Sequence, residues 1–220
     1  FENIRRAIAD FVAPPSAPGS ELAWADPTRN FPARLYGPYN PDELVRSRGL
    51  ETYYKMRKDD QVKIALAFKK FAVLSTKWVI ESPEGEDDEW EVSRFVRHAL
   101  GGDSAVLGGP DEPLESILME ILTALDFGYS VSEKIYAPIE QGEWAGKVGF
   151  KAIKTRAPDA FEFYQDEHGN LLELKQRTPN GYLTLPPQKF VIRTYREEFD
   201  NRYGRSDLQE AYRAWWHKEH

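Results

Sequence analysis

Apolar side chains recur at every third or fourth position through much of the first 128 residues, which is the spacing of amphipathic helices. The clearest stretch consists of Leu114, Ile117, Leu118, Ile121, Leu122 and Leu125. It predicts one helix that ends near Gly128. Earlier stretches with similar spacing predict helical structure at 41–58, as one helix or a pair, at 60–74 and at 92–100.

Polar residues mark the expected starts of these helices. Asn40 stands before a proline and two acids, so its side chain is expected to cap the first helix, and Asp59 or Asp60 can cap the second. The stretch 60–74 is apolar on most sides and is therefore expected at the centre of the fold. After it, 77–81 predicts a short strand. The apolar face expected for the third helix consists of Val92, Phe95, Val96, Ala99 and Leu100.

After Gly128 the pattern changes to short apolar runs separated by turn residues, which is typical of strands. Strands are predicted at 130–139, 148–155, 161–165, 171–177 and 189–195. Asp166–Asn170 and Thr178–Gly181 are expected to be hairpin loops. A last helix opens around Ser206. The predicted class is α+β, with helices followed by an antiparallel β meander and one final helix.

The first forty residues follow neither pattern. Residues 1–12 have roughly helical spacing, but prolines from Pro14 to Pro38 stop regular structure. Large apolar side chains are nevertheless present at Trp24, Phe31, Leu35, Tyr36 and Tyr39. They favour an arm that lies along another surface over a loose tail. The expected organisation is therefore 1–40 as an N-terminal helix and arm, 41–204 as the α+β domain, and 205–220 as the last helix.

The charge distribution argues against a protein that grips nucleic acid. The 220 residues include 29 Lys and Arg against 36 Asp and Glu, a net charge of −7. Seven acids and no basic residue lie between Glu81 and Glu91, so the remainder sums to zero. Binding through phosphates would need an excess of basic residues. The sequence also has no cysteine, which excludes thiol nucleophiles, iron–sulfur sites and disulfides.

Motifs that carry catalytic chemistry are not found in the sequence. It has neither a G-x-S-x-G elbow nor a phosphate-binding glycine loop, and no cofactor is expected. Asp126-Phe127-Gly128 matches a metal-binding tripeptide of protein kinases, but no other kinase motif accompanies it, so a helix end capped by Gly128 is the better interpretation. The four histidines, His98, His168, His217 and His220, are all expected at the surface. A metal-dependent nuclease or hydrolase that uses the acids near Asp87 and Asp111 stays an alternative without a motif.

Several short segments, in their order along the chain, resemble the portal proteins of tailed bacteriophages, most closely the Mu-like subgroup. They are 124–136, Gly142–Trp144, Phe161–Phe163, Pro187–Phe190 and Asn201–Leu208 with Ala211 and Tyr212. Asp60–Val62, which leads into a long helix, and Trp78–Ile80 are similar to the start of the same domain. The resemblance covers residues 45 to 218.

The resemblance implies a structural protein, not an enzyme, that forms a ring, usually of twelve subunits, at one capsid vertex. Terminase drives double-stranded DNA through the channel without sequence-specific binding, and the DNA is later ejected through it. The implied partners are the terminase large subunit and the capsid and head–tail adaptor proteins. The implied location is the virion, after assembly in the host bacterial cytoplasm, and a prophage copy is also compatible. Another head-completion or adaptor protein is the alternative within the structural class.

In the terms of that family, residues 41–204 resemble the wing and 205–220 the start of the stem helix, and the clip, tunnel loop and crown are expected to be absent from these residues. Candidate subunit-interface residues are Trp24, Phe31, Tyr36, Tyr39, Leu208, Tyr212, Trp215 and Trp216. Candidate channel-facing or ion-pairing residues are Arg205, Arg213 and Lys218. The apolar stripe of the last helix either meets a neighbouring subunit or closes over the strands of its own wing.

Overall fold

The computed structural model describes residues 40, 42–76, 78–82, 90–101, 109–166 and 168–219. Its helices are α3 (Glu43–Arg48), α4 (Glu51–Met56), α5 (Asp60–Leu74), α6 (Glu91–Ala99), α7 (Leu114–Ile121), α8 (Ala124–Phe127) and α9 (Asp207–Glu219). Its strands are β1 (Tyr129–Pro138), β2 (Val148–Arg156), β3 (Phe161–Gln165), β4 (Leu171–Thr178), β5 (Gly181–Leu185) and β6 (Phe190–Thr194). The predicted α+β class and the antiparallel strands are confirmed.

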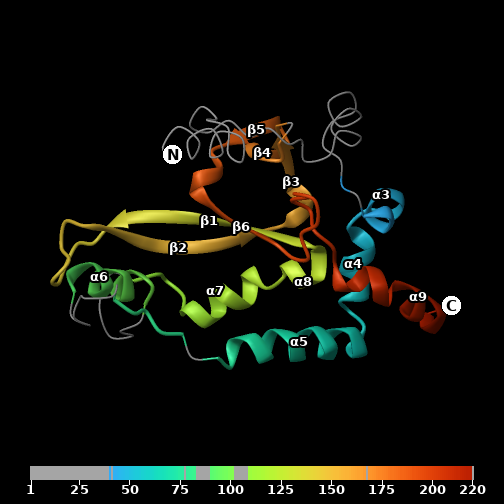
Figure 1. Ribbon diagram of the computed structural model, residues 1–220, viewed down its shortest axis with the longest axis horizontal. Helices are drawn as coiled ribbons and strands as arrows, with labels where there is room; N and C mark the ends of the chain where they lie inside the picture. The colour runs from blue at the N-terminus through green and yellow to red at the C-terminus, as the bar shows by residue number, and fades with distance from the viewer. Residues whose placement is uncertain are drawn as a thin grey trace, which may run out of the picture.

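The strands form two small sheets, in the orders β2-β1-β6 and β3-β4-β5. In the first sheet β1 is central, and Val131 pairs with Arg156 on one side and Ile192 on the other. The second sheet is a consecutive meander whose last strand, β5, was not expected from the sequence. Helices α5, α6 and α7 lie on one side of the first sheet, and the second sheet lies on the other (Figure 1).

Two apolar clusters hold these layers together. The helical cluster joins α4, α5, α8 and α9 through Leu50, Tyr53, Met56, Leu66, Leu125, Phe127 and Leu208. The second cluster lies between the sheets and contains Tyr129, Phe163 and Tyr203, whose rings meet edge-on with centroids 5.0 to 5.3 Å apart. The Tyr203 hydroxyl also accepts a hydrogen bond from the Phe163 backbone N–H at 3.2 Å.

Most of the residues predicted to cap or end a helix do so. Residues 43–56 form a pair of helices, and Asp59 caps α5 by accepting hydrogen bonds from two backbone N–H groups. Gly128 is the left-handed residue after α8, with φ of 88°. The cap of α3 differs, because Asp42 accepts the bonds from the helix N–H groups whereas Asn40 accepts one from Asp42. The long helix predicted up to Gly128 is interrupted by a turn at 122–123.

Three expectations about the helical half were wrong, the third of them only in part. Helix α5 is not central, since only Leu66 and Lys70 on it are buried. Residues 78–82 form no strand, because they follow α5 on the helical side, where no described strand is available for pairing. Helix α6 buries only part of its predicted face: Ala99 is buried and Phe95 packs against Trp144, whereas Val92 and Val96 are exposed and Ser93 and His98 are buried instead.

Candidate functional site between helices α5 and α9

Helix α9 is attached at its first turn to the buried end of α8. The Ser206 hydroxyl donates to the backbone carbonyl of Asp126 at 2.6 Å and accepts from the Leu208 N–H at 2.9 Å. It therefore caps α9 and links it to α8 at once. Leu208, 2% exposed, is anchored in the helical core. These contacts fix where α9 leaves the domain.

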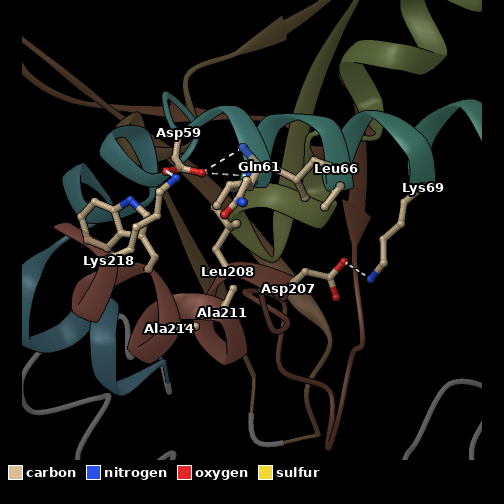
Figure 2. Close-up of a pocket in the computed structure, with 12 residues that line it drawn as sticks. Asp59, Gln61, Leu66, Lys69, Asp207, Leu208, Ala211, Ala214 and Lys218 are labelled. Carbon is tan, nitrogen blue, oxygen red and sulfur yellow. Dashed lines mark hydrogen bonds and ion pairs between the residues drawn. The ribbon is translucent and has the colours of Figure 1, made fainter.

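Helices α5 and α9 enclose a groove of about 660 Å³ (Figure 2). Its apolar lining comes from both helices and includes Val62, Ala65, Leu66, Ala211, Ala214 and Trp215. Small side chains on facing helices leave the space between them open. The groove is therefore apolar along its floor and open to the surface.

An ion pair joins the two helices at each end of the groove. The Lys69 ammonium lies 2.7 Å from an Asp207 carboxylate oxygen at one end, and the Lys218 ammonium lies 2.5 Å from Asp59 at the other. The hydrogen bond from Lys218, followed by the backbone N–H of Val62, lowers the pKa of Asp59. Asp59 therefore serves as the cap of α5 and as the anchor for the far end of α9.

A buried ionic cluster lies where α5 meets α8. Asp126 is fully buried, and its carboxylate lies 2.8 Å from the Lys70 ammonium and 2.8 Å from the Arg57 guanidinium. Burial raises the pKa of Asp126, although Lys70 and Arg57 act in the opposite direction. The predicted helix end at 126–128 is confirmed, but no sequence motif predicts this cluster, because its members lie far apart along the chain. Its signal was a lone acid among apolar neighbours.

Asp207 connects α9 to the segment after β6. Besides Lys69, its carboxylate accepts a hydrogen bond from the Tyr195 hydroxyl at 3.3 Å and pairs with Arg196 at 3.3 Å. Arg196 also pairs with Glu210, one turn further along α9, at 2.7 Å. The start of α9 is thus held by charges on two different segments of the chain.

The predicted interface residues fall into three groups. Trp24, Phe31, Tyr36 and Tyr39 lie outside the described residues. Leu208 belongs to its own subunit's core, and Tyr212 and Trp215 are half-buried against it. Trp216 is exposed. The α9 stripe therefore closes partly over its own domain, over the helical core and not over the strands, and leaves Trp216 on the surface.

The three predicted basic residues also differ from one another. Lys218 pairs with Asp59, and Arg205 lies 3.5 Å from Glu198. Arg213 is exposed on α9 and has no ion pair with another described residue. A channel-facing role for any of them stays a prediction.

The remaining candidate chemistry is dispersed. His98 is 5% exposed and packs near Trp144, with ring centroids 6.5 Å apart, so its expected surface position was wrong. Among the described residues no group of three or more His, Asp or Glu could hold a metal ion. Asp111 lines a separate cavity of about 370 Å³, and Asp87 lies outside the described residues. No described helix is long and apolar enough to cross a membrane.

Sequence reasoning also missed an exposed apolar surface on α5. Ile64, Phe68 and Phe71 point away from the domain and are 69%, 75% and 59% exposed. The signal was present, since α5 is apolar nearly all round. The pattern predicts a central helix, whereas only Leu66 and Lys70 of α5 are buried.

A family model described as the portal protein of Mu bacteriophage matches residues 50–220. The chain belongs to this portal family. The match confirms the resemblance and spans every described element from α4 to α9, so both walls of the groove lie within it. The portal family is a family of structural proteins and implies an oligomeric portal ring. A comparison with curated proteins gives no match.

Proposed function

We propose that this portal-family chain is a subunit of a ring of about twelve copies at one vertex of a phage capsid. DNA enters the capsid through the ring during packaging and leaves through it during ejection. The observation that carries the proposal is the family match over residues 50–220.

The charges suit a wall past which DNA moves without being held. Basic residues at the α5–α9 site are neutralised within the subunit: Lys69 by Asp207, Lys70 by Asp126 and Lys218 by Asp59. With a net charge of −7, the chain has little capacity to release counterions from phosphates. DNA binding is therefore expected to be weak and independent of sequence.

The ring would dock the terminase large subunit during packaging and the head–tail adaptor afterwards, with the capsid around it. Its location would be the virion, after assembly in the host bacterial cytoplasm. The energy for DNA movement would come from ATP hydrolysis by terminase. Consistent with this, the sequence contains no phosphate-binding loop.

The mass of the purified protein tests this function. Light scattering coupled to size exclusion is expected to give a mass of many copies, and electron micrographs are expected to give closed rings. Incubation with plasmid DNA, or with ATP and Mg²⁺, is expected to leave both substrates intact. A monomer with metal-dependent DNA cleavage that is lost in Asp111→Asn would instead support the enzyme alternative.

A further inference from the structure

The outward surface of α5 carries an apolar stripe over about half of the helix circumference, interrupted only by Gln61 and Lys69. At 100° per residue, Phe71, Ile64 and Phe68 follow one another around the helix, and Ala72 and Ala65 continue to Val62 in the groove. We call these six residues the α5 band. Its three large members are each more than half exposed. The band therefore adjoins the groove, with Gln61 and Lys69 as the polar positions between them.

Among the described residues, none covers the outward side of this band. Helix α5 is attached through Leu66 and Lys70 on its inner side and through the ion pairs of Asp59 and Lys69. A helix that is apolar all round is normally buried on most sides. Here the domain supplies contacts to only one side, so the other side lacks a partner within the described residues.

The size of the band suits one part of an interface between proteins. An aromatic side chain buries roughly 150–250 Å² when covered, so Ile64, Phe68 and Phe71 together expose on the order of 400 Å². That is about the largest apolar patch of a typical monomer and about half of the roughly 800 Å² that each partner gives to a standard interface. The adjoining groove extends the surface further.

The chain carries a second exposed surface on its opposite side, at the β4–β5 hairpin. Strand β5 is the last strand of its sheet, and Leu183 on it is half exposed, whereas its exposed neighbour Tyr182 points to the other face of the sheet. In Figure 1 this hairpin and α5 lie at opposite edges of the molecule. A head-to-tail contact between identical subunits requires two different areas that face apart. The described residues provide such a pair of areas.

We propose that the α5 band, with the adjoining groove, is the surface on which a second copy of this chain packs. This inference rests on the proposed function, because a ring gives every subunit an identical neighbour. The β4–β5 hairpin of the second copy is the counterpart that the opposite positions of the two areas favour. Helix α5 is then buried on both sides in the assembly, as its sequence pattern requires.

Substitution on the band tests the contact without damaging the subunit. Phe68→Ser and the double variant Phe68→Ser/Phe71→Ser are expected to shift the protein from ring to monomer in light scattering, with at least a tenfold rise in the concentration needed for assembly. Far-UV circular dichroism should be unchanged, because these side chains touch little of their own core. Phe199→Ser is the matched control, since Phe199 is 74% exposed elsewhere and should leave the ring intact.

Cross-linking identifies the occupant. A photoreactive phenylalanine analogue at position 68 is expected to join two copies, giving a band of twice the chain mass on a denaturing gel. A cross-link within one chain, for example to residues 1–39, would overturn the proposal. A wild-type ring that persists in the double variant would overturn this inference alone, whereas a wild-type chain that stays monomeric would overturn both it and the proposed function.

Discussion

Asp59 is the residue on which two roles converge, because it caps α5 and binds Lys218 near the end of α9. Its folded-state pKa lies below the ordinary value, so its charge stabilises the fold fully above about pH 3.9. That stabilisation is lost as the pH falls through the lower pKa of the folded state. Acid should therefore release the end of α9 from α5.

Asp59→Asn separates these two roles, since asparagine is also a good helix cap. The variant should melt at a lower temperature than the wild type at pH 7. The difference should shrink below pH 4, where the wild-type carboxylate becomes protonated. Calorimetry over pH 3 to 7 measures it, with Asp60→Asn as a control on the neighbouring acid. A difference that is constant over this range would mean that the ion pair with Lys218 contributes nothing.

At the scale of elements, the ends of helices and strands were predicted best, because residues close in sequence decide them. Gly128 ends α8 and the strand at 161–165 has its predicted bounds, because turn residues act on their immediate neighbours. The split into two sheets was not predictable, since β1 pairs with β6 about sixty residues away. The Lys70–Asp126 contact likewise joins distant residues. The central position predicted for α5 was wrong among the described residues, since an apolar pattern does not say which molecule covers it.

The buried ion pair of Lys70 and Asp126 is expected to add little net stability compared with apolar side chains in the same place. Asp126→Asn leaves Lys70 without a buried anion, which is expected to cost about 3–5 kcal/mol of unfolding free energy. The double variant Lys70→Met/Asp126→Leu should recover most of that loss, because apolar side chains of similar size fit the site and Arg57 can reach water. Urea denaturation measures both. A double variant as unstable as the single one would contradict this account.

The two tryptophans of α9 should differ in what they stabilise. Trp215 lies half-buried against its own core, so Trp215→Ser should lower the melting temperature of the subunit. Trp216 is 38% exposed, so Trp216→Ser should lower the melting temperature of the monomer less than Trp215→Ser does, and should weaken assembly if α9 meets a neighbour. Light scattering and thermal melts of both variants distinguish these effects. Rings of normal size in Trp216→Ser would remove α9 from the interface.

At the scale of the whole molecule, the proline-rich arm is the segment whose role only assembly can test. Its aromatic residues, including Trp24 and Tyr36, lead us to expect that residues 13–40 pack across a neighbouring subunit. Deleting them should reduce the oligomer mass while leaving far-UV circular dichroism nearly unchanged. A fall in the stability of the monomer would mean that the arm instead folds on its own subunit.

The ion pairs at the two ends of the groove hold α9 at its base and near its tip, so a small tilt of the helix moves the tip most. The helix has 13 residues and is about 20 Å long, so a tilt of about 5° at its base displaces its tip by nearly 2 Å. Ser206 holds the base, and Lys218 restrains the tip from swinging. In a closed ring every subunit would repeat the same displacement. If α9 begins the stem, as the resemblance predicts, the opening of the ring would widen or narrow with the strength of one ion pair, and hence with the salt concentration of the surrounding solution.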